Sequence, residues 1–135
     1  MTGILVDSCV LLDIVTEDPV WFEWSADMLE KHADKSYLYI NPIIYSEVSV
    51  GFKTIEEVEH ALPSGIFRKN PLPWEAAFLA GKSFLHYRKS GGKSLLPLPD
   101  FFIGAHALIE DFVLLTRDTN RFKHYYPSLK MIAPH

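Results

Sequence analysis

Short apolar runs alternate along the chain with longer stretches in which apolar residues recur at helical spacing. The strand candidates are residues 3–6, 37–40, 66–67, 112–116 and 128–132. The helix candidates are residues 8 to about 16, 20–33, 42–52, 54–61, 73–89 and 100–110. Strands that alternate with helices are typical of a parallel sheet covered on both faces. We therefore predict a three-layer α/β/α domain with a mostly parallel central sheet.

Local signals mark where several of these helices begin and end. Asn41 is a good N-cap for a helix with Pro42 at its first position, and Thr54 with Glu57 makes a capping box for the next. The glycines after Ser90 end the helix over residues 73–89, because glycine allows the left-handed turn of a helix C-terminus. Residues 117–120, after the strand at 112–116, are predicted to be a loop.

The helix predicted over residues 20–33 has two apolar stripes. We expect the first to face the core: Phe22, Ala26, Leu29 and Ala33. The second consists of Trp21, Trp24 or Ser25, and Met28, and it can also pack against the core. An additional apolar stripe makes this helix a candidate for contact with another protein.

Length and composition fit one compact domain over residues 1–135. Apolar residues make up 48% of the chain, enough for a core. No uncharged apolar run approaches the roughly 20 residues of a membrane span, and the first residues lack the features of a signal peptide, so we expect a cytoplasmic protein without membrane association. Cys9, the single cysteine, lies among apolar residues and is expected in the core.

The net charge of −4 does not favour a basic nucleic-acid-binding surface on totals alone. Basic residues do gather locally, as at Arg117, Arg121 and Lys123. The acids Asp13, Asp18, Glu23, Glu56, Glu59 and Asp111 are predicted to be solvated charges of helices or turns.

Four other carboxylates occupy positions that converge in the predicted fold. Asp7 and Asp118 follow strands, while Asp100 and Glu47 are expected in the first turns of two helices. Strand carboxyl ends and helix N-termini lie at the same edge of a parallel α/β sheet. Each acid alone also fits a cap or a turn, except Glu47, whose neighbours on the helix surface are apolar. Together they predict one acidic site.

Clustered carboxylates repel one another unless protons or a cation intervene, and oxygen ligands suit Mg²⁺ or Mn²⁺. Such a cation can deliver an activated water to a phosphodiester, which is nuclease chemistry. The six histidines stand at positions 32, 60, 86, 106, 124 and 135, and no pair has the spacing of a zinc motif.

The motifs in order resemble a PIN-domain ribonuclease of the VapC-like toxin type, from type II toxin-antitoxin pairs. The resemblance rests on Asp7-Ser8 after the first strand, on Asn41-Pro42 to Glu47-Val48, on Pro99-Asp100 to Ala107, and on Leu115-Thr116-Arg117-Asp118 to Phe122. It spans nearly the whole chain. The sequence departs from the usual pattern in carrying Phe101, Phe102 and His106 after Asp100.

The resemblance implies endonucleolytic cleavage of RNA with Mg²⁺ or Mn²⁺, commonly by a homodimer that a cognate antitoxin inhibits. It also implies site residues. The metal-binding acids would be Asp7, Glu47, Asp100 and Asp118, with Ser8, Thr116 and Asn120 as supporting polar groups. On this hypothesis the stripe of Trp21, Trp24 and Met28 contacts the antitoxin or a second copy.

Two other functions stay open on the sequence. A non-catalytic RNA-binding or scaffold PIN-like domain would have the same fold. A Mg²⁺-dependent phosphatase-like protein would use Asp7 as nucleophile, although the second aspartate of the phosphatase motif is replaced by Cys9.

Overall fold

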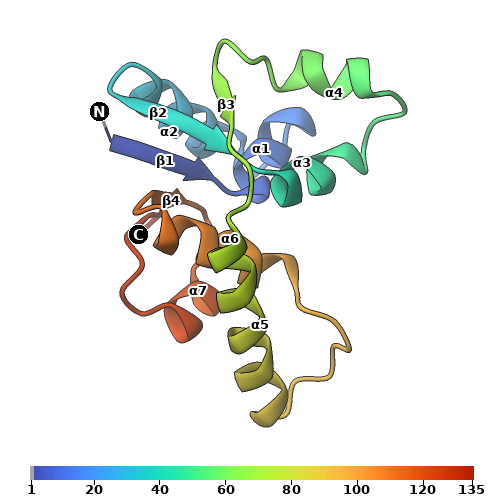
Figure 1. Cartoon of the computed structure of the whole chain (residues 1–135). Helices are drawn as coiled ribbons and strands as arrows, with labels where there is room; N and C mark the ends of the chain where they lie inside the picture. Colours follow the sequence, from blue (N-terminus) through green and yellow to red (C-terminus); the bar gives the residue numbers. More distant parts are fainter. Residues whose placement is uncertain (1) are drawn as a thin grey trace.

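A computed structural model describes residues 2–135 and contains five parallel strands within that range (Figure 1). The strands are β1 (Thr2–Val6), β2 (Ser36–Ile40), β3 (Phe67–Lys69), β4 (Val113–Leu115) and β5 (Met131–Ile132). Their order in the sheet is β3-β2-β1-β4-β5, so β1 lies at the centre. The predicted fold class is confirmed.

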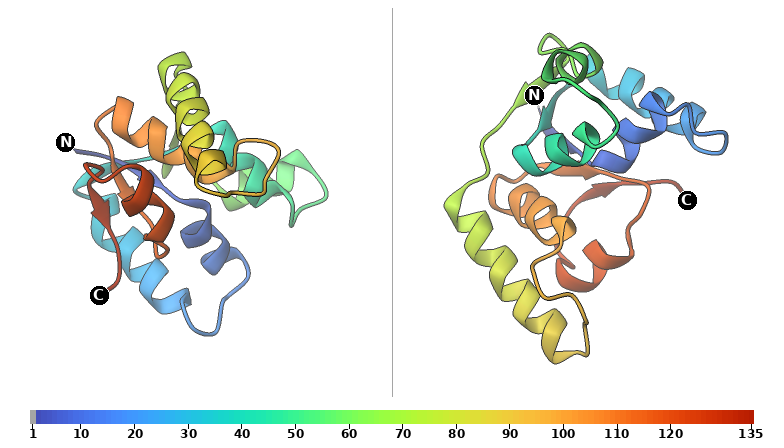
Figure 2. Two further views of the ribbon diagram at one scale, coloured as in Figure 1. Left: turned by 90° about the horizontal axis from the view of Figure 1, so that it is seen from below. Right: turned by 90° about the vertical axis from the view of Figure 1, so that its right-hand side faces the viewer.

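The helices form a layer on each face of the sheet. They are α1 (Ser8–Val15), α2 (Phe22–Ala33), α3 (Pro42–Ser49), α4 (Ile55–Ala61), α5 (Trp74–Lys89), α6 (Pro99–Ile109) and α7 (Asn120–Tyr125). Helices α1 to α4 lie on one side and α5 to α7 on the other (Figure 2). Right-handed crossovers produce this arrangement, because the chain moves outward from β1 in one direction and then returns to build β4 and β5.

The order of strands reverses between β1 and β4, which are neighbours. The chain adds β2 and β3 on one side of β1 and then β4 and β5 on the other. Val6 pairs with Leu115 in this parallel register, and the next residue, Asp7, donates its backbone N–H to the Leu115 carbonyl at 2.9 Å. Open α/β sheets bind ligands at such a switch point, beyond the carboxyl ends of the strands. Asp7 and Thr116 therefore face each other at the position where a ligand is expected.

Helix α6 brings a long apolar segment against the sheet. Phe101, Ile103, Ala105 and Ala107 are all fully buried. Gly104 is needed here, since a Cβ at this position would lie 2.5 Å from Cδ2 of Tyr126. The close approach of α6 to the chain after α7 fixes where Asp100, in the first turn of α6, is presented.

Away from the four acids, three details of the sequence prediction were wrong. The segment after β4 forms the short helix α7 over residues 120–125, where only a loop was predicted. On α2, Phe22 and Ala33 are exposed, and the side chain that is fully buried is Ser25. Asp13, expected in solvent, is 2% exposed. Ser25 donates a hydrogen bond to Asp13 Oδ2 at 2.7 Å, so a polar pair occupies this part of the interior.

The stripe of Trp21, Trp24 and Met28 is only partly exposed, and Trp24 and Met28 pack against the core. More exposed apolar side chains lie on α5 and in the loop after it: Trp74, Phe78, Leu85, Leu95 and Leu96. Within residues 2–135 no helix is long and apolar enough to cross a membrane.

Candidate active site

Asp7 is the central carboxylate of the candidate site. It ends β1 and caps α1, where Oδ1 accepts the Ser8 backbone N–H at 2.8 Å. Oδ2 accepts the Thr116 hydroxyl at 2.8 Å, which joins the ends of β1 and β4. Asp7 is 5% exposed. Burial raises the pKa of Asp7, against the lowering effect of these hydrogen bonds, and the charge of Asp118 raises it further.

Glu47 reaches Asp7 through one intervening side chain. The Ser8 hydroxyl donates to Glu47 Oε1 at 2.8 Å and lies 3.5 Å from Asp7 Oδ1. Glu47 stands in the second turn of α3, not the first as predicted, because α3 begins at Pro42. Burial, followed by the charge of Asp7, raises the pKa of Glu47 above its usual range.

Asp100 stands in the first turn of α6, with Pro99 at the helix start. Burial raises its pKa to about 6, and the negative charges of Asp7, Glu47 and Asp118 contribute to the rise. Arg121 of α7 opposes this effect from 3.8 Å. The charges of the other three predicted acids thus all act on Asp100, so the four lie in one region, at one edge of the sheet.

Asp118 is held by its backbone, and its carboxylate is exposed. Its N–H donates to Thr116 Oγ1 at 3.1 Å, the same hydroxyl that donates to Asp7. Thr116 is fully buried, and its one hydroxyl contacts the Asp7 carboxylate and the Asp118 backbone. Asn120 is exposed and makes no side-chain hydrogen bond within residues 2–135, so its predicted supporting role has no contact behind it in this structure. It lines a pocket beside Asp118 and Asp100.

The donor set fits a hard divalent cation in its chemistry. Carboxylates and hydroxyls are oxygen donors. Burial, with a smaller effect of the neighbouring carboxylates, raises the pKa values of Asp7, Glu47 and Asp100, and a bound cation would favour their ionised forms. Within residues 2–135, no three His, Cys, Asp or Glu side chains stand close enough together to enclose an ion as they are placed. Binding would therefore require side chains of the set to turn toward a common point.

Two side chains near the site were not assigned a role by the sequence. Cys9 Sγ lies 3.5 Å from both Asp7 Oδ2 and Thr116 Oγ1, and burial raises its pKa to about 11, so it is a thiol rather than a nucleophilic thiolate. Arg121 is the cation beside Asp100. Sequence reasoning grouped it with other basic residues, since nothing in the local sequence distinguishes it from Lys123.

A partly buried ion pair fixes the loop that carries Asp118. Arg117 makes a bidentate contact with Asp13, from Nε to Oδ2 at 2.9 Å and from Nη2 to Oδ1 at 3.0 Å. The guanidinium also lies 5.5 Å from the ring centroid of Trp21. These contacts attach the loop after β4 to α1 and to the start of α2.

His106, noted as unusual in the sequence, belongs to a second polar network at the same sheet edge. Its ring lies between Asn41 Nδ2 at 2.9 Å and Asn70 Oδ1 at 3.0 Å. Asn41 Oδ1 already accepts the Ile44 N–H, so Asn41 donates to Nδ1, and the His106 tautomer carries its proton on Nε2. Burial lowers the pKa of His106 to about 4, and the ring is neutral. The network joins α3, α6 and the segment after β3, and it has a structural role.

Comparison with known proteins agrees with the geometry. The model of the PIN domain family matches residues 4–126. A chain of VapBC2 from Rickettsia felis, solved bound to a DNA fragment from its promoter, is 18% identical with a TM-score of 0.75, covering 99% of this chain and 100% of that one. For VapBC-1 from nontypeable Haemophilus influenzae the identity is 17%, the TM-score 0.73 and the coverage 98% of each chain. A chain of a toxin-antitoxin complex from Klebsiella pneumoniae is 22% identical with a TM-score of 0.69, covering 98% of each chain. No curated protein matches the sequence.

Proposed function

Since this chain belongs to the PIN domain family, we propose that it is a metal-dependent endoribonuclease and the toxin of a toxin-antitoxin pair, with residues 1–135 as a single domain. The observation that carries the proposal is the contact of Ser8 with both Asp7 and Glu47, beside an Asp100 whose pKa is raised to about 6 by burial and by the other three acids. A set of carboxylates held in mutual repulsion is a common arrangement of a cation-binding hydrolase.

In this proposal Asp7, Glu47, Asp100 and Asp118 hold Mg²⁺ or Mn²⁺. When bound, the cation supplies an activated water and neutralises charge at the phosphodiester. Thr116 orients the Asp7 carboxylate and the Asp118 backbone through its single hydroxyl, and Ser8 orients Glu47. Such contacts to ligating carboxylates set their geometry and tune metal affinity.

The partner belongs to the same proposal. The similar chains come from solved VapBC and toxin-antitoxin complexes, and we propose a cognate antitoxin and a homodimer for this chain as well. The stripe of Trp21, Trp24 and Met28 is a poorer contact surface than the sequence indicated, because two of its three side chains pack against the core. Light scattering of the purified protein, alone and after expression with the neighbouring reading frame, measures both assemblies.

The test of activity is incubation of purified protein with a mixed cellular RNA pool in Mg²⁺ or Mn²⁺, beside an EDTA lane and the Asp7→Asn variant. We expect discrete fragments that are absent from both controls. Asp111→Asn is a matched variant, since Asp111 is exposed and outside the site, and it should cleave at the parental rate.

Intact RNA in every lane, from folded protein free of antitoxin, would contradict the nuclease. Metal-independent RNA binding in that protein would then support a non-catalytic PIN-like domain. Turnover of a phosphomonoester would support the phosphatase-like function.

A further inference from the structure

A pocket of about 560 Å³ adjoins the acidic site on the side of α5 and α7. It is lined by Tyr87, Asp100, Asp118, Asn120, Arg121 and Tyr125. Its size falls within the roughly 300–1,000 Å³ of ordinary small-molecule sites. Asp100 and Asp118 belong to the acidic set, so whatever occupies this Arg121 pocket lies directly beside that set.

The guanidinium of Arg121 is available to bind a ligand. Its contact with Asp100 is 3.8 Å from Nη1 to Oδ2, longer than a hydrogen bond, and the side chain makes no hydrogen bond within residues 2–135. Arg117, four residues earlier in the chain, shows the contrast, because two of its nitrogens bind Asp13 at 2.9 and 3.0 Å. A planar fork of free N–H donors matches the geometry of a phosphate group.

Aromatic rings surround Arg121 and are themselves fixed. The guanidinium carbon lies 5.7 Å from the centroid of Tyr87 and 5.8 Å from that of Phe101. Tyr87 packs edge-on against Phe101 at 5.6 Å, and its hydroxyl accepts the Ser94 N–H at 3.3 Å. On the other side Tyr125 packs edge-on against Phe101 at 5.1 Å. Both tyrosines are only partly buried, so part of each ring is accessible from outside.

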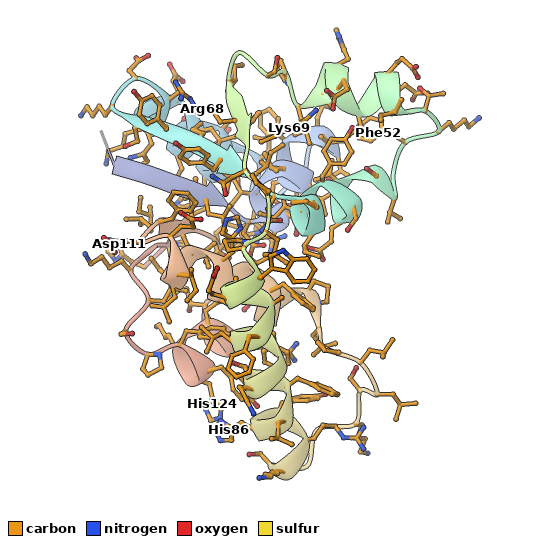
Figure 3. The ribbon with its side chains drawn as sticks, in the orientation of Figure 1. Phe52, Arg68, Lys69, His86, Asp111 and His124 are labelled. Atoms are coloured by element: carbon orange, nitrogen blue, oxygen red, sulfur yellow. The ribbon has the colours of Figure 1, made fainter. Side chains whose placement is uncertain are left out.

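Tyr125 is further held by two histidines, one from each of the helices that border the pocket. Its ring lies edge-on to His86 at 5.3 Å and to His124 at 4.6 Å, and Figure 3 shows the two histidines side by side, below α7 and beside α5. A ring fixed on several sides loses little conformational entropy when another flat group stacks on it.

We propose that the Arg121 pocket binds one unpaired nucleotide of the RNA next to the cleaved phosphodiester, with Arg121 on a phosphate and Tyr125 or Tyr87 stacking on the base. The proposal rests on the nuclease function above and adds to it the residues that hold the strand beside the acids. Bases in a duplex are already stacked on each other, whereas aromatic side chains take up the bases of single strands irrespective of sequence. The enzyme should therefore select single-stranded RNA.

The experiment measures RNA binding apart from cleavage. A fluorescein-labelled single-stranded RNA of mixed sequence, and the same strand annealed to its complement, are titrated with protein in EDTA and followed by anisotropy. The variants are Arg121→Gln, Tyr125→Leu and the control Arg68→Gln. Arg68 also lies over a tyrosine, 3.9 Å from the centroid of Tyr37, but on the far edge strand β3 (Figure 3). Circular dichroism confirms that each variant is folded.

We expect Arg121→Gln and Tyr125→Leu each to raise the Kd for the single strand roughly tenfold, while the parental protein binds the duplex more weakly. Arg68→Gln should change the Kd less than twofold, roughly the effect of one surface charge. In Mg²⁺, KM for the single strand should rise in the Arg121→Gln variant more than kcat falls. An unchanged Kd and KM in Arg121→Gln, or an equal loss in Arg68→Gln, would overturn the proposal and leave the nuclease standing. Failure of the parental protein to cleave or bind any RNA would instead remove the function itself.

Discussion

The hydroxyl of Ser8 donates a hydrogen bond of 2.8 Å to Glu47, and this bond joins two carboxylate-bearing helices across 39 positions of sequence. Ser8 is 7% exposed and Glu47 is half-buried, so water does not readily replace the bond. The orientation of Glu47 toward Asp7 consequently depends on a side chain that is not itself an acid.

Ser8→Ala should therefore weaken metal binding without unfolding the protein. Loss of a contact to a ligating carboxylate typically lowers metal affinity about 10–100-fold, and the lost hydrogen bond costs about 1 kcal/mol of stability. Calorimetric titration with Mn²⁺ measures the first, and urea unfolding the second. Ser46→Ala is the control, since Ser46 lies on α3 beside Glu47 and its exposed hydroxyl donates only to the Ile43 carbonyl. Equal Mn²⁺ affinity in both variants would show that Ser8 does not position Glu47.

The raised pKa of Asp100 predicts a pH dependence. Below about pH 6 the carboxyl holds a proton that a cation must displace, so Mn²⁺ affinity should fall as the pH drops through 6. Without metal, the free energy of unfolding depends on pH in the opposite direction. The pKa of Asp100 in the folded protein lies above the ordinary value of 3.8, so the stability contributed by protonated Asp100 is present below pH 3.8 and is lost as the pH rises through 6. Asp100→Asn should thus bind metal weakly, yet match or exceed the parental thermal midpoint at pH 8. A clearly lower midpoint at pH 8 would contradict the repulsion between these acids.

The pair of Arg117 and Asp13 predicts an asymmetry between two truncations. Arg117→Ala leaves a carboxylate that is 2% exposed with Ser25 as its remaining partner, and it should cost about 3 kcal/mol. Asp13→Asn keeps a polar group for Ser25, and the freed guanidinium, 28% exposed, can reach water, so the loss should be nearer about 1 kcal/mol. Urea unfolding of both variants gives the two values. A larger loss for Asp13→Asn would reverse this account of which partner needs the other.

Gly104 and Gly81 offer opposite effects of the same substitution. A Cβ at Gly104 would lie 2.5 Å from Tyr126, whose hydroxyl is tied to the Phe101 carbonyl at 2.7 Å, so Gly104→Ala should destabilise by about 1–3 kcal/mol. A Cβ at Gly81, in the exposed face of α5, meets nothing within 4 Å, and Gly81→Ala should stabilise by about 0.5–1 kcal/mol. Thermal unfolding with both proteins at equal concentration compares them. Equal thermal midpoints of the two variants would mean that α6 can move away from Tyr126.

The sequence predicted the elements well where the apolar pattern was long or capped, as in α3 with Asn41 and α4 with Thr54. It missed α7 because this helix has six residues and no side-chain cap. It placed Asp13 in solvent because the charge that balances it, Arg117, lies 104 positions away. The gathering of the four acids could be predicted from the topology of a parallel sheet. The position of the Arg121 guanidinium, without a hydrogen bond in residues 2–135 and 3.8 Å from Asp100, could not be predicted from the spacing of residues in the sequence.

The bond from Thr116 to Asp7 spans 109 positions and has a consequence for synthesis. A nascent chain exposes Asp7 long before the strand that completes its surroundings, because β4 begins only at Val113. Until then β1 has no β4 beside it, and the carboxylate lacks its buried hydroxyl partner. A polypeptide released before β4 therefore cannot assemble the acidic site, so a cell that translates this protein meets the finished site only after Thr116 has emerged.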